Sequence, residues 1–155
     1  MDEIMKIKDV ENWFLSKQEM SPKKLQKMLY YAYSWGLVFF NESVDSLKNT
    51  LFNADFEAWV HGPVIRDVYF EFSSYKYNNI EMRPNTAGVL PDDVEDLLNQ
   101  VLGAYGDFNG NELESITHSE LPWIEARKGL RPMDSSSVVI KTESIFEYYT
   151  GLLNK

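Results

Sequence analysis

The stretch that most restricts how this chain can fold is residues 21 to 40, "SPKKLQKMLYYAYSWGLVFF". Ser21 can cap a helix, and Pro22 suits the first helical position, where its missing N–H breaks no hydrogen bond. Small or apolar residues then recur at helical spacing at Leu25, Met28, Leu29, Ala32, Trp35, Gly36 and Phe39. A helix from Pro22 to Phe40 would be about 28 Å long. We therefore predict a mainly α, single-domain helical bundle around this long central helix.

Apolar spacing predicts several shorter helices around the central one. They fall near residues 6–18, 63–72, 90–106, 110–119, 122–128 and 141–153. The segment "FEAWV", residues 56–60, has the aromatic and β-branched character of a short strand, and "VVI", residues 138–140, could pair with it as a minor two-stranded β element. In "HGPV", Gly62 and Pro63 predict a rigid turn from that strand into the next helix, with Pro63 at its first position.

Length and composition favour one domain. With 155 residues and 44% hydrophobic content, the chain can bury one substantial core, so we expect residues 1–155 to form a single domain. No cysteine is present, which excludes disulfides and thiolate chemistry and fits a reducing cytosol. The start is acidic and no stretch is apolar enough to span a membrane. We expect a soluble cytoplasmic protein with no membrane partner.

The net charge of −9 is concentrated in the middle of the chain. Residues 42–125 contain sixteen Asp or Glu and four Lys or Arg, a local balance of 4 − 16 = −12. A surface this acidic repels phosphate backbones, so direct binding of DNA or RNA is disfavoured. A basic protein partner would be attracted to it, although an ordinary solvated acidic surface explains the same composition.

The stretch "THSELPWIEARKG", residues 117–129, concentrates polar chemistry and raises the question of catalysis. As an enzyme, the chain would use His118 as general base or metal ligand, with Glu120 as its partner. The alternative is a structural corner, in which Thr117 and His118 satisfy backbone groups where one helix ends. Pro122 would then begin the next helix while Trp123 packs into the core, and Trp59 in "FEAWV" and Glu120 are also assigned structural roles. We favour the structural interpretation for this motif.

Other catalytic, metal and cofactor patterns are missing. A catalytic zinc usually has three protein ligands, and the chain has two histidines, His61 and His118, without a His-Glu-x-x-His pattern. Ser135, Ser136 and Ser137 lie in a predicted loop without a histidine nearby in sequence, and no glycine-rich phosphate loop occurs. We therefore assign no catalytic residue, no metal site and no cofactor.

Four stretches taken together resemble the Panacea antitoxin domain, also known as SocA-like or GepA-like. They are "KLQKMLYYAYSW" at 24–35, "FEAWVHGPVIRDVYFEF" at 56–72, "LGAYG" at 102–106 and "LESITHSELPWIEAR" at 113–127. Their order and spacing agree with that family, and the resemblance extends from about Ile7 to Tyr149. Met28 stands where leucine is more usual, and His61 where an aromatic residue such as tyrosine is common.

The resemblance implies a mainly helical cytosolic domain, from bacteria or their phages, that neutralises a co-encoded toxin by binding it and is not an enzyme. Two alternatives stay open. One is a small hydrolase that uses His118 and Glu120, and the other is an adaptor that delivers a bound partner to a protease. Neither the identity of the toxin nor a homo-oligomeric state follows from the resemblance.

The toxin-binding surface is placed by a separate argument from residue types. The aromatic residues of the central helix cannot all face one core, and outward tyrosine or tryptophan is typical of protein interfaces. A rigid exposed turn at "HGPV" can also serve as a docking surface. The predicted toxin-binding residues are Tyr30, Tyr31, Trp35, His61, Gly62, Pro63 and Val64. The acidic helix from Asp92 to Tyr105 is the alternative location.

Overall fold

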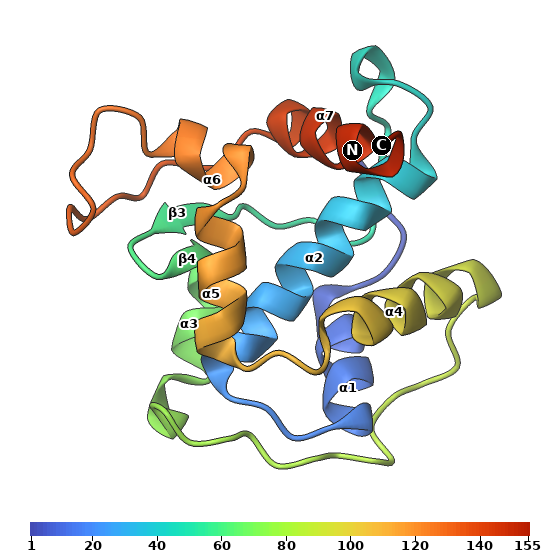
Figure 1. Cartoon of the computed structure of the whole chain (residues 1–155). Coiled ribbons are helices and arrows are strands. Elements are labelled where there is room, and N and C mark those ends of the chain that lie inside the picture. Colours follow the sequence, from blue (N-terminus) through green and yellow to red (C-terminus); the bar gives the residue numbers. More distant parts are fainter.

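The computed structural model describes all 155 residues and confirms the mainly helical fold (Figure 1). The α-helices are α1 (Ile7–Lys17), α2 (Pro22–Phe40), α3 (Arg66–Glu71), α4 (Asp92–Tyr105), α5 (Gly110–His118), α6 (Leu121–Ala126) and α7 (Thr142–Leu153). Two short 3₁₀ turns, η1 (Val44–Ser46) and η2 (Ser73–Tyr75), lie in the connections. The buried apolar side chains form one contiguous core. No helix is both long enough and apolar enough to cross a membrane.

Helix α2 has the bounds that the sequence predicts and runs through the middle of the molecule (Figure 1). Ser21 caps it, since the Ser21 hydroxyl oxygen accepts a 3.1 Å hydrogen bond from the backbone N–H of Lys24. Helices α1, α3, α4, α5 and α7 all contact α2. As a result every residue from Lys24 to Ser34 is buried, on all sides of the helix and not on one stripe only.

Two small sheets complete the fold. Strands β3 (Glu57–Trp59) and β4 (Gly62–Val64) form an antiparallel hairpin, and β1 (Asp2–Glu3) pairs in parallel with β2 (Asn49–Thr50), a pairing that the sequence did not predict. The predicted contact of "VVI" with "FEAWV" is present as a bridge between Val139 and Glu57. Residues 138–140 therefore lie along the edge of β3 that β4 leaves free.

The predicted helix start at Pro63 is wrong. Gly62 and Pro63 belong to strand β4, and α3 begins at Arg66. The chain reverses at Val60 and His61, after which Gly62 takes a φ of 106°, which favours glycine. Pro63 lies opposite Ala58, whose own N–H donates to the Val138 carbonyl at 2.9 Å on the other side of β3. The Ala58 carbonyl accepts its hydrogen bond from Arg127 and not from the hairpin, so no carbonyl of Ala58 is left unpaired by the missing N–H of Pro63.

Candidate functional site

The motif at residues 117–127 holds the β3–β4 hairpin in place. The Trp123 indole N–H donates a 2.9 Å hydrogen bond to the backbone carbonyl of Trp59. On one side of the Trp123 ring lies the His118 imidazole, stacked at 4.0 Å between ring centroids and tilted by 16°. Burial lowers the pKa of His118, and its Nε2 has no hydrogen-bond partner. His118 thus packs against Trp123 and does not face a substrate site.

Arg127 extends this contact to the loop after α6. Its guanidinium lies 5.2 Å from the Trp123 ring centre and donates a 2.9 Å hydrogen bond to the carbonyl of Ala58 in β3. Further hydrogen bonds reach the carbonyls of Arg131, Pro132 and Asp134 at 3.2, 3.3 and 2.7 Å. Only 6% of Arg127 is exposed, and all its hydrogen-bond partners are backbone carbonyls. One buried cation therefore joins the hairpin to residues 131–134.

Polar side chains of α2 bind the backbone of β4 and of Ile65, the residue that follows it. The Gln26 amide pairs with the backbone of Ile65 in both directions, accepting from its N–H at 2.9 Å and donating to its carbonyl at 3.0 Å. The Lys27 ammonium donates a 3.3 Å hydrogen bond to the carbonyl of Pro63. Lys27 is 1% exposed, and burial lowers its pKa to about 7. A Cβ atom at Gly62 would lie 2.7 Å from the Lys27 side chain, so the close packing requires glycine there.

Lys24 makes the corresponding contact with α4. Its ammonium donates to the carbonyl of Gly106, the C-cap of α4, at 2.5 Å, and to the Gln18 side chain at 2.8 Å. The three polar residues of "KLQK" thus bind the backbone of "HGPVI" and "LGAYG", segments that lie far apart in sequence. Sequence reasoning missed Lys24, Gln26, Lys27 and Arg127, because isolated polar residues in a helix are usually assigned to its wet face.

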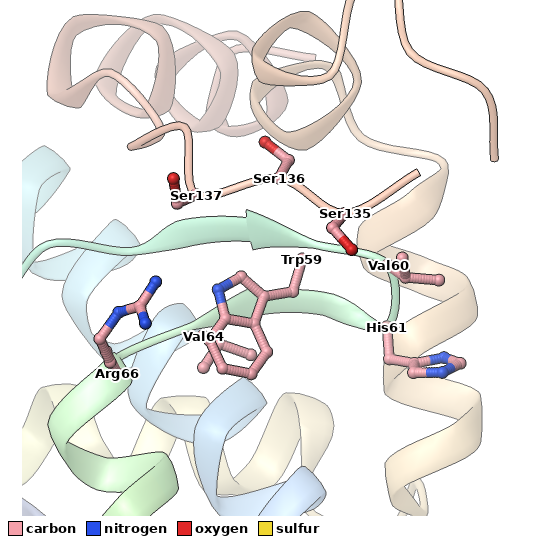
Figure 2. A pocket seen from close by; sticks show the side chains of 8 residues that line it. All are labelled: Trp59, Val60, His61, Val64, Arg66, Ser135, Ser136 and Ser137. Carbon is pink, nitrogen blue, oxygen red and sulfur yellow. The ribbon is translucent and has the colours of Figure 1, made fainter. Parts of the chain in front are cut away.

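The elements held in this way form a groove of about 490 Å³. The hairpin and the segment 135–137 form its walls, and Figure 2 shows the Trp59 ring over the hairpin, with Arg66 and His61 toward opposite ends. Arg66 donates to both oxygens of Glu57, at 3.0 and 2.7 Å, and these hydrogen bonds lower the pKa of Glu57. The groove is lined by Trp59, Val60, His61, Val64, Arg66, Ser135, Ser136 and Ser137.

Exposed aromatic side chains continue this surface along α3. Tyr69 is 47% exposed and Phe70 is 62% exposed, although both belong to a helix of six residues. The Tyr69 ring meets the Trp59 ring edge-on, with 5.0 Å between ring centres. Large exposed aromatic residues beside a groove are typical of protein interfaces. We define Trp59, His61, Arg66, Tyr69 and Phe70 as the docking face.

Most of the residues predicted to bind a toxin are not accessible. Tyr30 and Tyr31 are both fully buried, so neither presents an outward-facing ring. Gly62, Pro63 and Val64 are buried in β4. Trp35 is half-buried in a separate apolar groove against α4, where its indole N–H donates to the Tyr105 hydroxyl at 3.0 Å.

His61 is the one predicted residue that lies on the docking face with an exposed side chain. Its Nδ1 lies 3.1 Å from a carboxylate oxygen of Glu114, and 63% of the side chain is exposed. Sequence reasoning placed no histidine near the serine loop, whereas the structure puts His61 and Ser135 at the same groove. In Figure 2 the His61 ring points toward α5 and away from the serines, and no hydrogen bond links them. This arrangement lacks the contact that activates a serine nucleophile.

The carboxyl of Glu120 faces the core and not His118. One oxygen of Glu120 accepts hydrogen bonds from the hydroxyls of Tyr31 at 3.0 Å and Tyr149 at 2.8 Å. Burial raises the pKa of Glu120 to about 7. A general base and its orienting carboxylate need a direct hydrogen bond. The pairing on which the hydrolase alternative depended is therefore absent from the structure.

Comparison with known proteins gives one match. The family model described as "Antitoxin SocA-like, Panacea domain" matches residues 25–124, from the first turn of α2 into α6. This range contains the contacts of Gln26 and Lys27 with the hairpin and the hydrogen bond from Trp123 to Trp59. No curated protein and no solved structure matches the chain.

Proposed function

The chain belongs to the SocA-like Panacea antitoxin family, and from this premise we propose that it is an antitoxin that neutralises a co-encoded toxin by binding it directly. Among the structural observations, the docking face gives this proposal its main support. There Trp59, Tyr69 and Phe70 hold aromatic surface in contact with water beside a groove. Burying such large side chains against another protein contributes strongly to binding free energy.

The docking face has the composition that energetic centres of interfaces usually have. Tryptophan, tyrosine and arginine dominate such centres, and Trp59, Tyr69 and Arg66 adjoin one another here. The Arg66 guanidinium lies 5.7 Å from the Trp59 ring centre and is held by Glu57. Because Arg66 is fixed before binding, ordering its side chain costs little when a partner arrives.

The surrounding contacts keep the docking face rigid. Trp123 and Arg127 fix the backbone of β3, Lys27 fixes that of Pro63 in β4, and Gln26 fixes that of Ile65 between β4 and α3. A preformed surface loses less conformational entropy on binding than a mobile one. The mechanism that we propose is stoichiometric: the antitoxin covers a working surface of the toxin in the cytoplasm, without catalysis.

The test is neutralisation of the toxin by variants of the docking face. The toxin candidate is a short reading frame adjacent to this gene that cannot be cloned alone, and rescue is measured by co-expression. The double change Tyr69→Ala with Phe70→Ala should lower toxin affinity by about 30-fold or more, since losing a central aromatic contact costs roughly 2 kcal/mol.

The control for that test is Tyr77→Ala, which removes a tyrosine that is 95% exposed and lies outside the docking face. It should leave both rescue and affinity unchanged. Circular dichroism checks that each variant is folded. A folded double variant with full affinity would move the interface away from α3, and the apolar groove at Trp35 and α4 would be the next surface to examine.

A further inference from the structure

A second pocket, of about 290 Å³, shares Arg66 with the groove. Residues of α1, of the segment 53–57 and of α3 line it. Five of the lining residues are acidic, namely Glu11, Asp55, Glu57, Asp67 and Glu71. Arg66 is the only basic residue that lines it, and both oxygens of Glu57 already accept hydrogen bonds from Arg66. We refer to this as the acidic pocket.

Glu11 is incompletely paired in the acidic pocket, because its ion pair with Lys8 includes no hydrogen bond to Oε1. Its side chain is 2% exposed, and its Oε1 has no hydrogen-bond partner. The nearest cation is the Lys8 ammonium, 3.6 Å from Oε1, which donates its hydrogen bond to Glu71. Burial and the neighbouring Glu71 raise the pKa of Glu11 to about 7. A buried carboxylate without donors is costly, so a donor that enters the pocket would be bound favourably.

The charges around the pocket do not cancel. When Glu11 is ionised, five carboxylates against Arg66 and Lys8 leave a balance of 2 − 5 = −3. No three of the carboxylates are arranged to hold a metal ion. An arginine guanidinium carries five N–H donors on three nitrogens, whereas a lysine ammonium carries three on one nitrogen. A guanidinium can therefore donate to Glu11 inside the pocket and to Asp67, which is exposed, at its edge, and an ammonium can donate to either.

We propose that the acidic pocket binds a lysine or arginine side chain that the protein partner inserts next to the docking face. Arg66 lines both the groove and the acidic pocket, so one partner can contact both surfaces. This inference rests on the proposed function for the identity of the partner, but the pocket's chemistry can be tested without the toxin. Charge-assisted hydrogen bonds to Glu11 would provide the affinity, and the surrounding carboxylates would attract a basic surface.

The experiment uses the full chain and three small probes. N-acetyl-arginine methylamide and N-acetyl-lysine methylamide carry the two basic side chains, and N-acetyl-citrulline methylamide is the uncharged counterpart of arginine. Carbon-13 NMR follows the side-chain carboxyl of Glu11 during titration at pH 7. A charged probe should cause a saturable shift and should lower the pKa of Glu11, because a cation favours its charged form. The citrulline probe should cause neither, and which basic probe binds more tightly identifies the preferred side chain.

Two variants show whether the response belongs to the pocket. Glu11→Gln keeps the size of the side chain, and Asp67→Asn changes an exposed residue whose loss does not endanger folding. Calorimetry measures the affinity of each variant, because Glu11→Gln lacks the carboxyl that the NMR titration follows. Asp67→Asn should weaken binding of the charged probe at least threefold, and Glu11→Gln at least tenfold. Asp92→Asn, an exposed carboxylate of α4 outside the pocket, is the matched control and should bind as the wild type does. Equal shifts with the citrulline probe, or unchanged affinity in Glu11→Gln, would overturn the inference.

The outcome is separable from that of the toxin experiment. Probe binding at Glu11 with no toxin rescue would retain the pocket and reject the antitoxin function. Rescue that depends on Tyr69 and Phe70, with no binding of either charged probe, would retain the antitoxin function and reject the pocket.

Discussion

The guanidinium of Arg127 donates a 2.9 Å hydrogen bond to the carbonyl oxygen of Ala58, across 69 positions of sequence. Replacing Arg127 with methionine removes this bond and those to residues 131–134. Hydrogen bonds that involve a charged group contribute about 1.5–3 kcal/mol, so Arg127→Met should lower the free energy of unfolding by about 3 kcal/mol in urea titrations. Arg131→Met, at a side chain that is 88% exposed, should change it by less than about 0.5 kcal/mol. Equal losses in both variants would contradict the role of Arg127.

Glu120 should make the protein less stable as the pH rises toward neutrality. Its pKa is raised from 4.5 to about 7 in the folded state. A raised carboxyl pKa contributes stability that is fully present below pH 4.5 and is lost as the pH rises through about 7. The difference corresponds to roughly 3 kcal/mol. Glu120→Gln should remove this decline in urea titrations between pH 4.5 and 8. Both proteins carry Glu11→Gln, which removes the second carboxyl with a raised pKa. If the protein that retains Glu120 has constant stability over that range, the prediction is refuted.

Lys27 should have the opposite effect at higher pH. Its pKa is lowered from 10.5 to about 7, so its contribution is fully present above pH 10.5 and is lost as the pH falls through about 7. Lys27→Met fills the same space without a charge and should raise the free energy of unfolding at pH 7 by roughly 2 kcal/mol, after the lost bond to Pro63 is allowed for. The gain should shrink as the pH approaches 10. Lys23→Met, at a partly exposed lysine of the same helix, is the control and should show no such gain.

His118→Ala should weaken the fold without ending neutralisation. The substitution removes the ring that stacks on Trp123 at 4.0 Å. An aromatic pair contributes about 0.5–1.5 kcal/mol beyond its buried area, so the melting temperature should fall by several degrees. Calorimetry gives the melting temperature, and co-expression with the toxin at a permissive temperature gives the activity. A variant with unchanged melting temperature but no neutralisation would show that His118 acts in function and not in packing.

Local sequence patterns were sufficient for the helices. The N-cap at Ser21, the proline at position 22 and the apolar spacing that follows gave the bounds of α2, because capping and helical hydrogen bonds involve residues a few positions apart. The same reasoning located the other helices and the contact between residues 138–140 and β3. It failed at Pro63, because a proline suits either a helix start or a strand position without a ladder bond.

The candidate site depended on tertiary structure. Helical spacing indicated that the tyrosines of α2 could not all face one core, but α2 is surrounded on all sides, so Tyr30 and Tyr31 are buried. The docking face requires Trp59 in β3 to contact Tyr69 in α3. The acidic pocket requires Glu11 in α1 and Asp67 in α3 to line the same cavity.

The sequence by itself determined which segments become helices and which family the chain resembles, since both are encoded in residues that are close in sequence or in the order of short motifs. Only the tertiary structure decided which side chains contact water and which polar groups share a pocket. Burial and electrostatic environment are set by neighbours from other elements, and backbone contacts such as those of Lys27 and Arg127 bring those elements together.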